Sequence, residues 1–129
     1  MATPLNTKKV TPLINDKAWD NLLELATDSG DDVVAEIGNA FLTQVQEMGA
    51  KFRAAAGNAK GFSELAHNLK SSAGGVGAEA LAEFALDWET RARHGELPKP
   101  ANLTQLDALL AETAEEIRAR LTALTRKVA

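Results

Sequence analysis

The chain has 129 residues, 45% of them apolar, which suits one domain with a single core. It carries 14 basic and 18 acidic side chains, a formal charge of −4, with no long basic run, which argues against nucleic-acid binding. The lack of cysteine excludes disulfides, thiolate metal sites and a cysteine nucleophile. No apolar run is long enough for a membrane span or a targeting segment, so we expect a soluble, cytoplasmic protein.

Apolar residues recur at helical spacing along the chain, and no stretch alternates apolar and polar residues as a half-buried strand would. The pattern predicts a short first helix over residues 16–27. A long amphipathic second helix follows from the acidic stretch "DSGDD" and runs to the "AAAGNAKG" connection. A third helix starts near Phe62, and its end is marked by Gly74, Gly75 and Gly77, which readily take positive φ.

A fourth helix carries apolar residues from Leu81 to Ala92, and after the "HGELPKPAN" loop a last helix carries a long stripe from Leu103 onward. Short connections make neighbouring helices antiparallel. The sequence therefore predicts an all-α fold, an antiparallel up-down four-helix bundle with one additional short N-terminal helix. We expect residues 1–12 to form a flexible lead and residues 13–128 to form the bundle, which has one apolar stripe per helix to bury and is therefore expected to be a monomer. Five aromatic residues fall on the predicted core stripes: Trp19, Phe41, Phe52, Phe84 and Trp88.

The stretch "AHNLKSSAGGVG" places a basic pair, His67 and Lys70, on the outer face of the third helix. At 100° per residue His67 lies about 160° from the middle of the apolar arc, with Lys70 one turn away. An imidazole in water is largely neutral at pH 7, so its free nitrogen can attack a phosphoryl group, and the lysine can offset the incoming charge. The small side chains at Ser71 and Gly74 would let another protein approach the ring. This chemistry suits a histidine that a docking partner phosphorylates and dephosphorylates.

These residues resemble the core pattern of the histidine-containing phosphotransfer (HPt) domains of multistep phosphorelays. The pattern is His-x-Leu-Lys-Gly, two small residues, then Gly-Ala and a later Leu, and the sequence matches it in register at His67, Leu69, Lys70, Ser72, Ala73, Gly77, Ala78 and Leu81. The similarity extends over about residues 19–124 and includes Trp88-Glu89 before "RARHGE". One departure is Ser71, where the family usually has glycine.

The resemblance implies that His67 accepts a phosphoryl group from the aspartate of one receiver domain and passes it to another, with Lys70 stabilising the phosphoryl charge. The expected partners are response-regulator receiver domains, with a hybrid histidine kinase as a further candidate. No cofactor or metal is expected on this chain, because the receiver would hold the magnesium ion, and no kinase or phosphatase activity of its own is expected. The pathway and the direction of phosphate flow stay open, and the Met-Ala start favours a free-standing protein.

The expected docking surface includes residues of the second and third helices: Leu42, Ser63, Glu64, Ser71 and Gly74. Leu42 lies about 100° off its helix's apolar stripe, so it fits either an apolar rim near His67 or the edge of the core. Serine in place of glycine at position 71 is expected to hinder docking at most modestly.

Other interpretations of these residues stay open at this point. His67 alone could be an ordinary surface histidine, and His94 fits a basic ring at a helix C-terminus. A metal site at the two histidines and a hydrolase at Ser71 lack an obvious acidic partner in sequence, and the Gly74–Gly77 run lacks the Lys-Ser/Thr of a phosphate-binding loop. The alternative function is a phosphorylation-independent helical adaptor, and a kinase dimerisation module would need a further ATP-binding domain.

Overall fold

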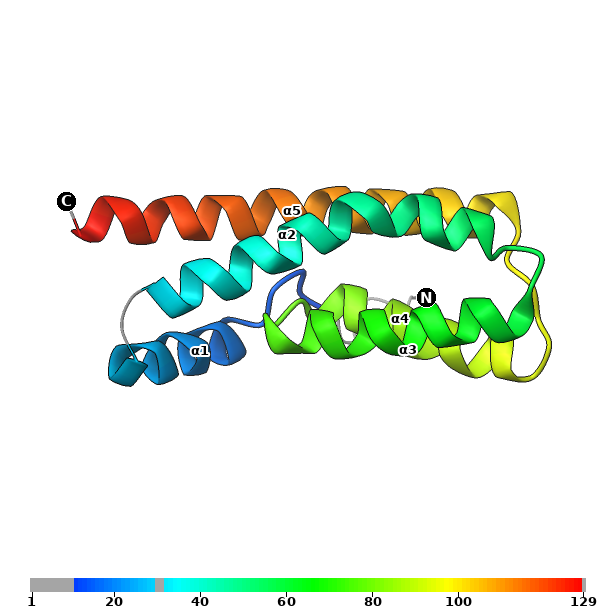
Figure 1. The fold of residues 1–129 in the computed structure, drawn as a ribbon, viewed down its shortest axis with the longest axis horizontal. Coiled ribbons are helices and arrows are strands. Elements are labelled where there is room, and N and C mark those ends of the chain that lie inside the picture. Colours follow the sequence, from blue (N-terminus) through cyan, green and yellow to red (C-terminus); the bar gives the residue numbers. More distant parts are fainter. Residues whose placement is uncertain (1–10, 30–31, 129) are drawn as a thin grey trace, which may run out of the picture.

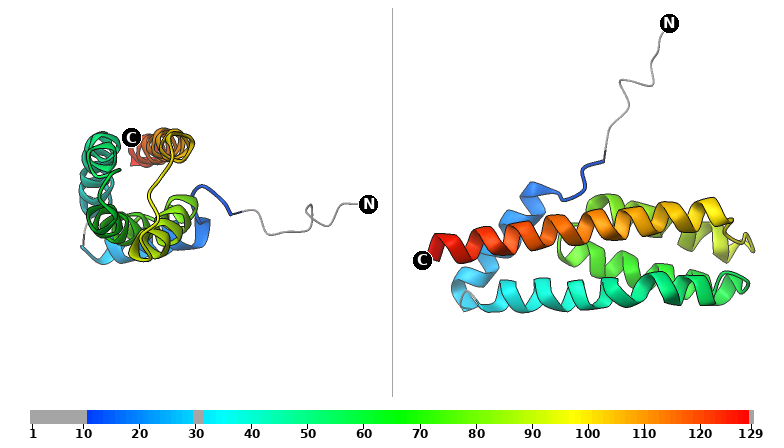
Figure 2. Two further views of the ribbon diagram at one scale, coloured as in Figure 1. Left: turned by 90° about the vertical axis from the view of Figure 1, so that its right-hand side faces the viewer. Right: turned by 90° about the horizontal axis from the view of Figure 1, so that it is seen from above.

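The computed structural model describes residues 11–29 and 32–128, which form five helices and no strand. They are α1 (Asp16–Ser29), α2 (Asp32–Ala54), α3 (Ala59–Gly75), α4 (Glu79–Arg93) and α5 (Pro100–Val128). Figures 1 and 2 show α2 and α5 as one antiparallel pair lying over a second pair, α3 and α4. The predicted all-α class and the bundle with an extra N-terminal helix are confirmed. Among the described residues, no helix is long and apolar enough to cross a membrane.

The α2–α5 pair is longer than the α3–α4 pair, and α1 lies along the part of the longer pair that the shorter pair does not reach. Because α3 and α4 are shorter than α2 and α5, α1 lies beyond the α3–α4 turn and crosses the remaining length of the longer pair (Figures 1 and 2). Arg120 of α5 holds α1 there, since its guanidinium contacts Asp16 at 2.7 Å and lies 5.7 Å from the Trp19 ring centroid. The predicted junction at Gly30 lies outside the described residues, as does most of the predicted lead, 1–12.

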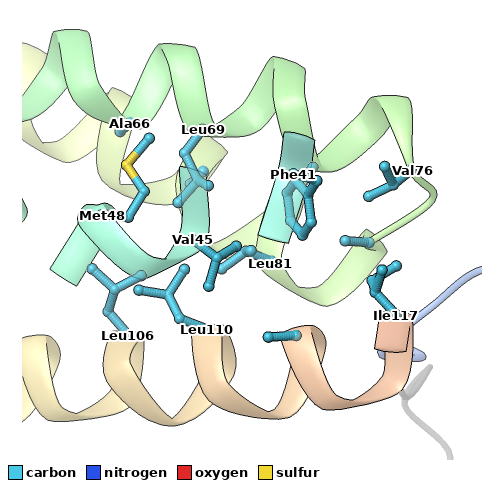
Figure 3. Packing of buried hydrophobic residues seen from close by; sticks show 14 of the residues in the cluster. Phe41, Val45, Met48, Ala66, Leu69, Val76, Leu81, Leu106, Leu110 and Ile117 are labelled. Atoms are coloured by element: carbon cyan, nitrogen blue, oxygen red, sulfur yellow. The ribbon is translucent and has the colours of Figure 1, made fainter. Parts of the chain in front are cut away.

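A single apolar core runs between the helix pairs. Figure 3 shows side chains of α2, α3, α4 and α5 meeting there. At one end Phe62 packs edge-on between Phe52 and Trp88, with ring centroids 5.0 and 5.5 Å away. The predicted aromatic residues are buried except Phe84, which is half-buried on the core's edge. The most completely buried large apolar side chains are Phe52, Phe62, Leu69, Leu81, Leu106, Ile117 and Val34.

Polar caps and glycines set the helix ends. The Asn58 side chain accepts a hydrogen bond from the Gly61 amide and begins α3, three residues before the predicted start. At the other end of α3 only Gly77 takes a positive φ, of 76°, whereas Gly74 and Gly75 belong to the last helical turn. The tight turn that follows returns the chain directly into α4, and α3 and α4 pack against each other more extensively than any other pair of the described helices.

The segment before α1 is fastened to that same turn. The Asn15 amide donates to the Gly77 carbonyl at 2.7 Å, and the Asn15 side chain donates to Glu79 at 2.7 Å. The Ala80 amide donates to the Pro12 carbonyl at 3.1 Å, so residues 12–15 lie along the start of α4. These bonds hold the α3–α4 pair and α1 in one fixed arrangement.

Candidate functional site

The outer face of α3 presents His67 to solvent, as the helical geometry predicts. Phe62, Ala66, Leu69 and Ala73 of this helix are buried, whereas the His67 side chain is 56% exposed. Burial of the opposite face fixes the rotation of α3 about its axis. The imidazole is therefore held on a rigid helix and open to an approaching group.

A buried carboxylate of α4, Glu89, organises the site. One oxygen, Oε2, lies 2.8 Å from His67 Nδ1 and also accepts a 2.8 Å hydrogen bond from Arg93. The other, Oε1, accepts a 2.7 Å hydrogen bond from Lys70 Nζ. The Glu89 side chain is only 5% exposed, while those of Lys70 and Arg93 are 33% and 67% exposed. Two elements thus bring four ionisable side chains into one cluster.

The partners of Glu89 favour its charged form. The Lys70 ammonium hydrogen bond lowers the pKa of the Glu89 carboxyl most strongly; burial opposes this shift, and the hydrogen bond to His67 adds to it. Glu89 is therefore ionised at neutral pH, and a charged carboxylate can only accept hydrogen bonds. The neutral His67 ring must then carry its proton on Nδ1, which leaves a lone pair on Nε2.

The ring borders an open hollow of about 460 Å³. Its lining comes from α3 and α4 alone and consists of Ser63, Glu64, His67, Asn68, Glu89 and Arg93. Since Nδ1 is turned to the buried carboxylate, Nε2 at the far side of the ring is the nitrogen available to a reacting group. The arrangement provides a positioned nucleophile with two cations nearby.

The predicted site residues fall into two groups. His67, Ser63 and Glu64 line this hollow, with the Ser63 hydroxyl 3.5 Å from the Glu89 carbonyl oxygen, and Lys70 is joined to the site by its hydrogen bond to Glu89. Ser71 and Gly74 are exposed further along α3, and Gly74 lines a separate apolar hollow beside α1. Leu42 is partly buried on α2 and packs against the core, and it lines neither hollow.

The sequence analysis did not identify Glu89 and Arg93 as residues of this site. One signal was present, because Glu89 lies at the edge of the apolar stripe formed by Leu81, Ala85 and Trp88. A charged residue at such a position is rarely buried without a partner. The sequence does not say which residue of which helix that partner is.

His94 has a structural role at the end of a helix, as predicted. It is the C-cap of α4, and its Nδ1 donates to the Thr90 carbonyl oxygen at 2.8 Å. Within the described part of the chain, no group of three His, Asp or Glu side chains is placed to hold a metal ion.

The four-helix bundle holds an exposed histidine beside a lysine, which is the arrangement that the resemblance to phosphotransfer domains predicts. Comparison with known families agrees, because the model of the Hpt domain family matches residues 21–126. The chain therefore belongs to the Hpt domain family, whose members act in histidine phosphotransfer within phosphorelays. No curated protein sequence matches the chain.

Among solved structures, the chain is similar to histidine-containing phosphotransfer protein B (HptB) from Pseudomonas aeruginosa. The two share 26% sequence identity with a TM-score of 0.74, over 84% of this chain and 94% of the other. The likeness covers nearly the whole of that protein, so the bundle and its order of helices are common to both.

Proposed function

We propose that this chain carries a phosphoryl group on Nε2 of His67 and relays it between the aspartates of receiver domains. The observation that carries the proposal is the 2.8 Å contact between His67 Nδ1 and the buried Glu89 carboxylate, which leaves Nε2 open on an exposed, rigid helix. Membership of the Hpt domain family supports the same chemistry.

In the transfer, the Nε2 lone pair attacks the phosphorus of an aspartyl phosphate. The new N–P bond forms as the aspartate O–P bond breaks, and the released electron pair stays on the partner's carboxylate. Lys70, whose ammonium is one helical turn from the ring, offsets the charge of the phosphoryl oxygens. The receiver domain would bind the magnesium ion, and this chain would contribute the positioned nucleophile. We propose no autonomous kinase or phosphatase activity.

The receiver would dock over the outer face of α3, where short side chains allow a close approach. Ser63 and Glu64 border the ring, and the exposed Ser71 and Gly74 extend the same face towards α1. In this proposal Leu42 adds an apolar contact from α2, and the same side chain packs against the core. We propose that the chain works in the cytoplasm as a monomer, without binding membranes or nucleic acid.

The test uses radiolabelled, phosphorylated receiver domains from the same organism. Label is expected to appear on the wild-type chain, to be lost in mild acid and to be retained in alkali, as a phosphoramidate requires. His67→Gln should abolish labelling, whereas the matched variant His94→Ala should label as the wild type does. Because position 67 is exposed, glutamine there should cost little stability.

Three outcomes would contradict the proposal. Label that persists on the His67→Gln protein, or that survives acid, would place the phosphoryl group on another side chain. Receiver binding without any label on the wild-type chain would instead favour the phosphorylation-independent adaptor.

A further inference from the structure

The outer groove between α3 and α4 continues past the site towards α1. Gly74 follows His67 by seven residues on α3, which places it on the same face of the helix, about 10 Å further along. On the antiparallel α4, Ala82 precedes Glu89 by seven residues and lies about 10 Å along in the same direction. Both residues line the hollow beside α1. Because a stable protein interface covers about 800 Å² on each partner, a domain that docks on His67 also covers this hollow.

This hollow is apolar and is formed before any partner arrives. It has a volume of about 340 Å³, and its lining includes the small side chains of Ala18 and Ala82. The Asn15 amide donates to the Gly77 carbonyl and the Asn15 side chain donates to Glu79, both at 2.7 Å, so α1 is held against the α3–α4 turn. A preformed apolar hollow binds an inserted side chain with little loss of conformational freedom.

An exposed leucine lies between the hollow and the site. Leu86 is four residues after Ala82 and three before Glu89, so these three residues form one stripe along α4. Leu86 is 50% exposed. Together with Ala18, Gly74 and Ala82 it makes up the apolar patch, an exposed apolar surface of the kind that marks a protein–protein contact.

The charges beside the apolar patch suit an acidic partner. Lys17 lines the hollow, and Lys70 lies one turn from Gly74 on α3. The Glu79 carboxylate, which also lines the hollow, already accepts a hydrogen bond from Asn15. A receiver domain would hold its magnesium ion with carboxylates, because hard cations take oxygen ligands. The surface around its phosphorylated aspartate is therefore acidic and complements the two lysines.

We infer that the apolar patch is the anchor for a receiver domain, which inserts an apolar side chain into the hollow about 10 Å from its reacting aspartate. The inference rests on the proposed function, in which a receiver docks over His67. It extends the docking surface from α3 onto α1 and α4. The patch sets which receiver binds and how tightly, because its residues contact no atom that reacts.

Two neighbouring glycines offer a matched pair of variants. Gly74 and Gly75 both lie in the last turn of α3, neither has a positive φ, and a Cβ on either would meet nothing within 4 Å. Leucine fits at both positions, and both substitutions raise helix propensity. Of the two, only Gly74 lines the hollow. Gly74→Leu therefore fills the hollow with a side chain, whereas Gly75→Leu places the same side chain outside it.

The measurement titrates each variant with the phosphorylated receiver that labels the wild-type chain and follows single-turnover transfer. Gly74→Leu should raise the half-saturating receiver concentration by about tenfold, because the inserted side chain of the receiver no longer fits. The rate at saturation should change far less, since the residues around the ring are the same. Gly75→Leu should behave as the wild type does. Equal half-saturating concentrations for the two variants would overturn the inference.

A second pair of variants removes an apolar contact instead of blocking one, and it decides the matter if Gly74→Leu fails to fold. Leu86→Ala should raise the half-saturating receiver concentration by about fivefold. Leu97→Ala is the matched control, because Leu97 is 46% exposed in the α4–α5 loop and lines neither hollow. Equal affinities for Leu86→Ala and Leu97→Ala would overturn the inference.

Failure of this inference can be told apart from failure of the proposed function. If a receiver labels the wild type and binds all the variants equally, the inference alone is overturned. If a receiver binds without labelling the chain, the proposed function fails, and calorimetric affinities of the same variants still decide the inference. Light scattering tests a different occupant, since a wild-type dimer that Gly74→Leu dissociates would assign the apolar patch to a second copy of the chain and overturn the inference.

Discussion

At the scale of single residues, Lys70 can pair with two different anions, the Glu89 carboxylate and a phosphoryl group on His67. In the resting protein its ammonium donates to Glu89 at 2.7 Å. A phosphoryl group on the neighbouring His67 would offer stronger acceptor oxygens to the same partly exposed side chain. The resting ion pair keeps the lysine near the ring before the phosphoryl group arrives, so less ordering is required during transfer.

Lys70→Ala should therefore slow phosphate acceptance from a phosphorylated receiver by about ten- to a hundredfold. The fold should remain, because Arg93 and His67 still contact the buried Glu89 carboxylate. Single-turnover labelling measures the rate, and circular dichroism checks the helix content. Lys60→Ala removes an exposed lysine from the first turn of the same helix and is the matched control. Equal rates for the two variants would remove Lys70 from the mechanism.

The exposure of His67 could be predicted from the sequence, because one helix obeys a fixed rotation of 100° per residue and its apolar arc is dense. Its contact with Glu89 could not, because the two residues are 22 positions apart and meet only across the α3–α4 interface. The rotation of each helix fixes which residues face outward. The relative sliding of two helices, which decides which pair touches, depends on the shape of the whole interface.

At the scale of the elements, the α3–α4 turn joins the site to α1. Gly77 has a φ of 76°, and its carbonyl accepts the Asn15 amide at 2.7 Å. A Cβ added there would lie 3.1 Å from the Ala18 Cβ and 3.3 Å from the Asn15 carbonyl oxygen. Gly95 at the end of α4 has a similar φ of 93°, but a Cβ there would meet nothing within 4 Å.

Gly77→Ala should lower the free energy of unfolding more than Gly95→Ala does. Both substitutions carry the left-handed backbone strain of about 1–2 kcal/mol, and only the first also forces α1 away from the turn. Urea titration followed by circular dichroism measures both values. Equal losses would mean that α1 adapts to the added methyl group, and that its packing on the turn is loose.

The order and number of helices could be predicted because each helix carries an apolar stripe. The observed helix ends, however, lie two or three residues from the predicted ones. α3 starts at Ala59 and α5 at Pro100, whereas the apolar stripes suggested starts at positions 62 and 103. The reason is that a helix begins at its polar cap, and its first turn precedes the first core contact. Asn58 caps α3 through its side chain, and proline is well suited to the first turn of α5.

At the scale of the whole molecule, an ion pair joins the two helices of each antiparallel pair. Glu89 joins α4 to α3 through Lys70, and Asp107 joins α5 to α2 through Arg53. The hydrogen bond from Lys70 lowers the pKa of Glu89, and that from Arg53 lowers the pKa of Asp107. The Asp107 side chain is 42% exposed and the Glu89 side chain 5%, so water screens the Asp107 pair far more.

These shifts predict that acid destabilises the fold mainly through Glu89. A carboxyl whose pKa is lower in the folded state stabilises the protein above its unfolded pKa, and this contribution is lost as pH falls through the folded pKa. The free energy of unfolding of the wild type should thus decline from about pH 5 downward. Glu89→Gln should flatten that decline more than Asp107→Asn, although both variants change the net charge equally. Urea titrations at a series of pH values measure the slopes. If the two variants flatten the decline equally, burial of the Glu89 cluster does not strengthen its ion pairs, and general charge repulsion explains the acid sensitivity.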